Sequence, residues 1–144
     1  MTLMRLWMIS RTICKCMKYL LDMHVLLWLL EDDTLIPVET LINLKKPVNR
    51  LSVSIVSIWE IGIKQSLGKL SLTRSIQDII NELPNLSIAL MPILPTHIIE
   101  LTKLPFHHHD PFDRLLIAQS LSEGLTVVSK DAYFPLYSIS VKWK

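Results

Sequence analysis

The chain has 144 residues, the usual length of a single domain and enough to bury a full hydrophobic core. Its residues are 50% hydrophobic with a mean hydropathy of +0.38, yet no apolar run approaches the roughly 18 residues of a membrane-spanning helix. The net charge of +2 creates no strong basic field, so charge neither indicates nor excludes a nucleic-acid substrate.

The amino-terminal segment, residues 1–16, differs from the rest of the chain. It carries Arg5 and Arg11 among apolar residues and follows neither a strand nor a helix pattern. It also lacks the uninterrupted apolar core and the small-residue cleavage site of a signal peptide. We therefore expect a disordered or wrongly assigned extension before Met17, and a single domain over residues 17–144.

Both cysteines, Cys14 and Cys16, lie in this segment. Their spacing is poor for a disulfide, and no partners elsewhere complete a zinc site. They fit a reducing cytoplasm.

Strand patterns and helix patterns alternate through the rest of the chain. Short apolar or β-branched runs indicate strands, and apolar residues at helical spacing indicate helices. The first half of the chain gives a strand, two helices, a strand and a helix at residues 18–22, 24–30, 34–44, 51–53 and 55–67. Ser54 can cap the last of these helices, and Gly68 ends it.

The second half continues in the same way. It gives a helix, a strand and a helix at residues 71–83, 87–93 and 96–104, then a helix and a strand within 110–131, and a last strand at 137–143. Pro84 ends the first of these helices, and Thr96 is the expected cap of the next one. This alternation predicts an α/β fold in which a parallel sheet carries helices on both faces.

Residues 110–131 hold the clearest local pattern. Asp110 can accept the unpaired amides of a first helical turn, and Pro111 suits the first helical position because it has no amide to satisfy. Gly124 ends this helix, and the apolar run that follows predicts a strand buried on both faces. Asp131 comes after that strand, where open α/β sheets place their chemistry.

Acids recur at corresponding places in the predicted fold. Asp22 ends the first strand, Glu60 lies within a helix, Asp113 lies at a helix start and Asp131 follows a later strand. The carboxyl ends of parallel strands meet at one edge of a sheet, so we expect these side chains to converge. Two unpaired carboxylates about 4 Å apart repel by roughly 4 kcal/mol at an effective dielectric of about 20, so such a cluster needs a cation.

Oxygen-only ligands favour Mg²⁺, with Mn²⁺ as the second choice. The matching chemistry is hydrolysis of a phosphodiester, in which bound metal lowers the pKa of an attacking water and stabilises the attacking and leaving oxygens. No protein nucleophile is required.

The chain resembles the PIN-domain ribonucleases, and most closely the VapC-type toxins of bacterial toxin–antitoxin pairs. The resemblance covers residues 17–143 and depends on four segments in the right order: LLDMHVLLWLL, SVSIVSIWEIGIKQSLGKL, HHHDPFDRLLIAQSLSEGLTVVSKD and the final SVKW. It implies a three-layer α/β/α PIN-like fold with a central parallel sheet.

The resemblance also implies roles for single residues. Asp22, Glu60, Asp113 and Asp131 become the metal-binding catalytic acids, while Asp110 is either a further metal-binding acid or only the helix cap. One position departs from the pattern of these toxins, which commonly have Thr after the first acid where this chain has Met23. The hydroxyl that could orient Asp22 is therefore absent from that position.

Three further side chains are expected to contact the substrate. Lys64 and Arg114 are candidate phosphate contacts, or else they only balance the carboxylates. Ser129 keeps a hydroxyl near the fourth acid.

Histidines and tryptophans near these acids have simpler interpretations. His107, His108 and His109 are consecutive and cannot all face one ion in regular structure, so we expect a loop whose imidazoles lie near substrate phosphate rather than a zinc site. Trp28 and Trp59 lie on apolar helix faces and are expected in the core rather than as base-stacking platforms.

Two function classes follow. The first is a Mg²⁺-dependent endoribonuclease acting as a cytoplasmic toxin, with RNA as substrate, a cognate antitoxin as partner and a homodimer as its assembly. The expected dimer faces are the helices at residues 34–44 and 54–67. The second is a catalytically weakened PIN protein that binds RNA or a partner, a possibility raised by Met23.

Overall fold

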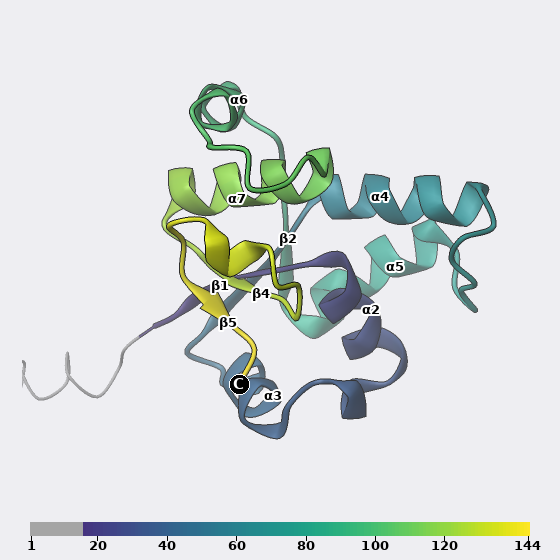
Figure 1. Ribbon diagram of the computed structural model, residues 1–144. Coiled ribbons are helices and arrows are strands. Elements are labelled where there is room, and N and C mark those ends of the chain that lie inside the picture. Colours follow the sequence, from purple (N-terminus) through teal and green to yellow (C-terminus); the bar gives the residue numbers. More distant parts are fainter. Residues whose placement is uncertain (1–15) are drawn as a thin grey trace, which may run out of the picture.

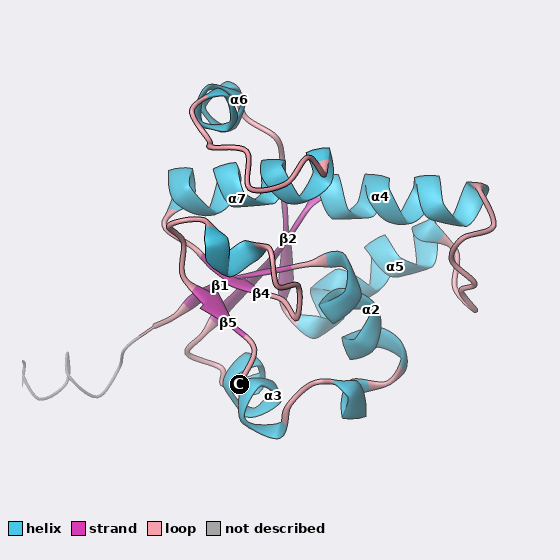
Figure 2. Ribbon diagram, in the orientation of Figure 1, coloured by secondary structure: helices cyan, strands magenta, loops and turns pink. Residues whose placement is uncertain are grey.

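The computed structural model describes residues 16–144. Its centre is a five-stranded sheet in the order β3-β2-β1-β4-β5, and every pair of neighbouring strands is parallel (Figure 2). The strands are β1 (Lys18–Leu21), β2 (Arg50–Ser54), β3 (Ile88–Met91), β4 (Thr126–Val128) and β5 (Val141–Lys142). Their carboxyl ends therefore share one edge.

Helices cover both faces of this sheet. The six α-helices of the described residues are α2 (Met23–Glu31), α3 (Val38–Lys45), α4 (Ile55–Ser66), α5 (Ile76–Glu82), α6 (Pro95–Thr102) and α7 (Pro111–Glu123). Helix α7 covers one face with α6 packed on its outer side, and α2, α3 and α5 lie toward the other face (Figure 1). The predicted three-layer α/β/α fold with a parallel sheet is confirmed.

Alternate residues of β1 show how the two faces are filled. Tyr19 and Leu21 belong to the core cluster beneath α2 and α5, whereas Leu20 belongs to the cluster beneath α7. Successive side chains of a strand point to opposite faces, so a strand covered on both faces is apolar at most of its positions. This requirement accounts for the continuous apolar runs in the sequence.

Several predicted boundaries are wrong for local reasons. The helix expected at 34–44 begins only at Val38, because a short 3₁₀ turn (Asp33–Leu35) precedes it and Pro37 provides its cap position. The helix expected from residue 71 begins after Ser75, whose side chain forms a reciprocal capping box with Asp78. The last strand is limited to Val141–Lys142.

The helix expected to be capped by Thr96 begins one residue earlier, at Pro95. The ring of His97 replaces the expected cap, since its Nδ1 accepts a hydrogen bond from the Leu94 N–H at 2.9 Å. Its Nε2 lies 2.8 Å from a carboxylate oxygen of Glu123, which ties α6 to the end of α7. The histidine is fully buried, so both ring nitrogens need these partners.

The expected extension at residues 1–16 lies outside the described residues, apart from Cys16, which is exposed. Within residues 16–144, no helix combines the length and the apolar character needed to cross a membrane.

Candidate active site

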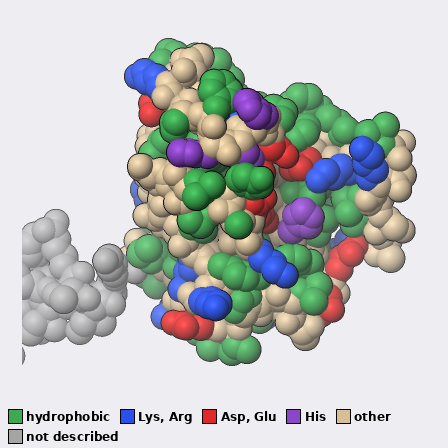
Figure 3. All heavy atoms as spheres, in the orientation of Figure 1, with side chains coloured by type: hydrophobic (Ala, Val, Ile, Leu, Met, Phe, Trp, Pro, Cys, Tyr) green, Lys and Arg blue, Asp and Glu red, His purple; other side chains and the backbone are tan. Residues whose placement is uncertain are grey.

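A narrow cleft of about 90 Å³ opens at the carboxyl edge of the sheet. Figure 3 shows acidic side chains gathered in a hollow of the drawn face. All five predicted acids line the cleft together with four other side chains: Asp22, Glu60, Asp110, Asp113, Asp131, Met23, His24, Lys64 and Leu116. The structure therefore brings together acids that are up to 109 positions apart in the sequence, from Asp22 to Asp131.

Asp22 is fixed where β1 passes into α2. One carboxylate oxygen accepts the Val25 N–H at 2.9 Å and so caps α2, a role that the sequence had not assigned to it. The other oxygen accepts the hydroxyl of Ser129, which follows β4. Burial raises the pKa of Asp22, and these two hydrogen bonds act in the opposite direction.

Ser129 connects two acids of the cleft. Besides donating to Asp22, its hydroxyl oxygen accepts the backbone N–H of Asp131 at 3.0 Å. Ser129 is buried, and its hydroxyl is committed to both acids. The contacts of Ser129 therefore orient two acids, and its expected contact with substrate stays a prediction.

Glu60 lies in the middle of α4 and is almost fully buried. Its Oε1 lies 3.0 Å from the Nζ of Lys64, one helical turn later. The ammonium therefore offsets part of the negative charge of the cleft, and its partial exposure leaves it accessible to an anion.

Asp110 and Asp113 share the first turn of α7 but differ in role. Asp110 caps the helix, since one of its oxygens accepts the N–H groups of Phe112 and Asp113 at 2.9 and 3.1 Å. The pKa of Asp113 is raised to about 8, first by burial and then by the charges of the neighbouring acids. At neutral pH the metal-free cleft therefore holds a proton on Asp113.

His108 supports Asp113 from the loop before α7. Its Nε2 lies 3.3 Å from Oδ2 of Asp113, its Nδ1 lies 2.8 Å from the hydroxyl of Tyr137, and its ring stacks on Tyr133 with centroids 4.8 Å apart. Burial lowers the pKa of His108, so near neutral pH its contact with Asp113 is a hydrogen bond between neutral groups. His107 and His109 are exposed and make no such contact with an acid in the described residues.

Arg114 points away from the cleft. Its buried guanidinium donates to the carbonyl of Pro105 at 2.7 Å and to the hydroxyl of Tyr137 at 3.1 Å, and it lies 4.0 Å above the ring of Phe106. These contacts hold the 104–106 loop against α7. The expectation that Arg114 contacts substrate phosphate finds no support in this placement.

The donor set of the cleft suits a hard cation, since its convergent side chains supply carboxylate oxygens. Within residues 16–144, no three His, Cys, Asp or Glu side chains are already close enough to form a ready coordination site. The cleft is thus unlike the closed cage of a structural zinc site. Mg²⁺ needs only one or two carboxylates and keeps several waters, so Asp22, Glu60, Asp113 and Asp131 are the residues that could hold it.

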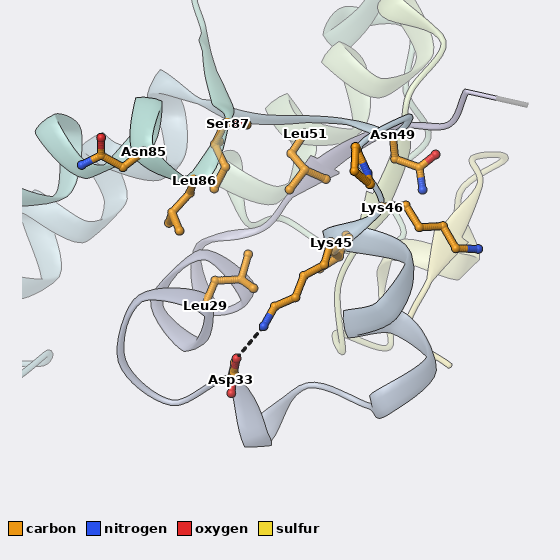
Figure 4. Close-up of a pocket in the computed structure, with 12 residues that line it drawn as sticks. Leu29, Asp33, Lys45, Lys46, Asn49, Leu51, Asn85, Leu86 and Ser87 are labelled. Atoms are coloured by element: carbon orange, nitrogen blue, oxygen red, sulfur yellow. Dashed lines mark hydrogen bonds and ion pairs between the residues drawn. The ribbon is translucent and has the colours of Figure 1, made fainter. Parts of the chain in front are cut away.

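A larger pocket of about 430 Å³ lies near the amino ends of β2 and β3 (Figure 4). An ion pair between Lys45 and Asp33, 3.2 Å apart, crosses the drawn region, and Leu29, Leu51 and Leu86 contribute apolar surface. None of the predicted site residues lines this pocket.

Comparison with known families agrees with this geometry. The sequence model of the PIN domain matches residues 19–139, which include all of β1 except Lys18 and every acid of the cleft. The chain belongs to the PIN domain family. No curated relative matches it by sequence.

Solved structures share this fold at low sequence identity. A chain of VapBC2 from Rickettsia felis, bound to a promoter DNA fragment, has a TM-score of 0.68 at 14% identity, with 89% of this chain and 100% of that chain covered. DNA-bound VapBC from Salmonella typhimurium has a TM-score of 0.61 at 15% identity, with 89% of this chain and 99% of that chain covered. VapBC-1 from nontypeable Haemophilus influenzae has a TM-score of 0.60 at 16% identity, with 88% of this chain and 97% of that chain covered.

The positions of two side chains in this PIN domain were not predicted from the sequence. Tyr137 was assigned only to a strand, although its hydroxyl joins His108 to Arg114. Trp59 was expected in the core, but 58% of its surface is exposed and its ring meets Phe112 edge to face. Apolar spacing indicated the helix that carries Trp59 without showing whether that position lies in the core.

The first prediction concerns the pH dependence of stability without metal. The native state holds a proton on Asp113 up to about pH 8, whereas an unfolded carboxyl loses it near its ordinary value of 3.8. The free energy of unfolding should therefore fall as pH rises between these values. Asp113→Asn should remove part of this fall, as measured by urea unfolding in EDTA at about pH 5 and about pH 8.

Glu39→Gln is the control for this measurement, because Glu39 is exposed on α3 outside the cleft. It should leave the pH dependence as in the wild type. Equal pH dependence in the wild type and Asp113→Asn would contradict the argument.

A second prediction concerns Tyr137, whose hydroxyl contacts both His108 and Arg114. Tyr137→Phe should lower the free energy of unfolding by about 1 kcal/mol, since a buried hydrogen-bonding group is lost and two partners remain. Tyr133→Phe removes a hydroxyl from a ring that is half exposed and keeps the stack on His108, so it should have little effect. Equal losses in the two variants would show that the network adds nothing.

Proposed function

We propose that this PIN domain is a Mg²⁺-dependent endoribonuclease, with Mn²⁺ as an alternative metal, that hydrolyses RNA phosphodiesters as the toxin of a toxin–antitoxin pair. The single observation that supports it most is the convergence of Asp22, Glu60, Asp113 and Asp131 in one cleft at the carboxyl edge of a parallel sheet. A binding protein with no chemistry at this edge would have no need to bury like charges together.

Bound metal would supply an activated water and would offset the charge on the phosphoryl oxygens. The contribution of the chain is to fix the ligands before substrate arrives. Ser129 and the Val25 N–H hold both oxygens of Asp22, and Asp113 would have to give up its proton to serve as a ligand. Lys64 shares its charge with Glu60 and is the proposed phosphate contact.

Asp110 is the cap of α7, and the sequence also raised it as a metal ligand. Its capping oxygen is occupied by two amides, which leaves the other oxygen for a ligand role. We propose that it shapes the charge of the cleft rather than binding metal directly, since neighbouring charge from Asp110 is one cause of the raised pKa of Asp113.

The proposed partner is a cognate antitoxin. The structural neighbours described above are VapBC proteins, and a further one is a toxin-antitoxin complex from Klebsiella pneumoniae with a TM-score of 0.54. A basic side chain from such a partner would relieve the repulsion among the acids without metal. Self-association through α3 and α4 stays a proposal, and it is supported by exposed apolar residues on both helices: Val38, Ile42 and Trp59.

The decisive experiment is cleavage of total cellular RNA by the purified chain, free of antitoxin, with Mg²⁺, with Mn²⁺ and with EDTA. Discrete fragments should appear only with metal. The double variant Asp22→Asn, Asp113→Asn should give none, because two ligands lose their charge. Glu39→Gln, which changes an exposed acid outside the cleft, should cleave as the wild type does.

Circular dichroism and metal titration by calorimetry accompany this assay. A wild type that is folded and binds metal but cleaves no RNA would exclude the nuclease and favour the second candidate, a PIN protein that binds RNA or a partner. A double variant that still cleaves would exclude the cleft as the active site.

A fourth prediction compares the two positions that could orient Asp22. Ser129→Ala should lower the cleavage rate about 10- to 100-fold, as expected when a group that orients a metal ligand is lost. Met23→Thr should change the rate by less than about 10-fold, because Asp22 already accepts a hydroxyl from Ser129. Initial rates at saturating metal would test this, and the opposite order of effects would show that position 23 controls the acid.

A further inference from the structure

A second hollow, of about 280 Å³, adjoins the acid cleft. Asp22, His24 and Asp131 line both spaces, so the hollow continues from the proposed metal site. Its other walls are Trp28 and Lys130. Neither the family match nor the structural neighbours assign a role to this hollow.

The aromatic wall of the hollow is held in place by the fold. His24 and Trp28 lie one turn apart on α2, with ring centroids 5.9 Å apart. The ring of Trp143, just after β5, also contacts the indole of Trp28, with ring centroids 5.5 Å apart. Trp28 is half-buried, so it is neither the core residue expected from the sequence nor a free surface side chain. Such a fixed, partly exposed indole is a suitable stacking surface.

Lys130 gives the hollow a positive charge. It follows Ser129 directly and is exposed. Among the described residues it forms no salt bridge, although Asp131 is its neighbour in the chain and both line the hollow. Its ammonium is therefore available to an anion that enters the hollow from the acid cleft.

These groups match the parts of one nucleotide. The aromatic surface suits its base and the free ammonium suits its phosphate, and both lie beside the proposed phosphodiester-cleaving centre. We propose that this hollow binds one unpaired nucleobase of the RNA next to the cleaved phosphate, stacked on Trp28 beside His24, with Lys130 contacting the adjacent phosphate. The inference rests on the proposed nuclease function and adds a specificity to it. A base inside a helix cannot reach the hollow, so the enzyme selects single-stranded or loop nucleotides.

The first test measures binding of a fluorescein-labelled single-stranded RNA, in EDTA, by anisotropy. Trp28→Ala should weaken binding about 10-fold, and Trp28→Phe should restore most of it, because stacking needs an aromatic ring rather than the indole N–H. Lys130→Ala should weaken binding and reduce the slope of log K against log salt by about one. Lys46→Ala, an exposed lysine at the far edge of the sheet, is the matched control and should bind as the wild type does.

The second test uses cleavage with Mg²⁺ and RNA in which single bases are removed around the cut site. For the wild type, KM should rise when the base at one position is removed. Trp28→Ala should show no further rise in KM at that position, because the stacking partner of the base is already missing. Lys130→Ala is informative even if Trp28→Ala does not fold, since its side chain is exposed.

The outcomes separate the two proposals. A folded wild type that does not cleave RNA defeats the nuclease function itself. A wild type that cleaves RNA while Lys130→Ala and a folded Trp28→Ala keep its KM, with no sensitive abasic position, overturns the base-binding hollow alone. The base-binding hollow is also overturned if the variants bind single-stranded RNA and duplex RNA more weakly by the same factor. General charge attraction would then explain the weaker binding.

Discussion

Asp22 is the residue on which the sheet, the first helix and the candidate site all depend. Its backbone N–H donates to the carbonyl of Val128 at 3.1 Å and continues the pairing of β1 with β4. Its carboxylate caps α2 through Val25 and accepts the hydroxyl of Ser129. Each bond satisfies a group that burial would otherwise leave unpaired. The fold therefore fixes the first acid of the cleft as a consequence of building the sheet.

The same arrangement concentrates negative charge that the chain alone does not neutralise. Lys64 pairs with Glu60, but the pKa of Asp113 is raised to about 8 by burial and by the surrounding acids. A protein selected only for stability would not place so many carboxylates together, and their presence in one cleft is typical of a site whose function depends on unrelieved charge. The repulsion thus becomes binding energy for whatever cation or basic side chain enters the cleft.

Much of the architecture could be predicted from the sequence, because buried parallel strands and amphipathic helices leave strong patterns. The boundaries were less predictable where a local contact decided them, as at Pro37 and in the capping box of Ser75 and Asp78. Contacts between distant residues left no pattern at all: the bond from Ser129 to Asp22 spans 107 positions, and that between His108 and Tyr137 spans 29. The acids could be predicted because strand ends converge, whereas the groups that orient them depend on side-chain packing.

The structure shows what Met23 contributes at the position after Asp22. Its side chain is buried in the core cluster beneath α2, so position 23 contributes packing here instead of a hydroxyl. The hydroxyl on Asp22 comes from the end of β4, and the same oxygen accepts the N–H of Asp131. A hydroxyl placed on α2 would orient one acid, whereas Ser129 ties two acids to one strand end. The first acid is therefore supported from the sheet in this chain, although position 23 carries no hydroxyl.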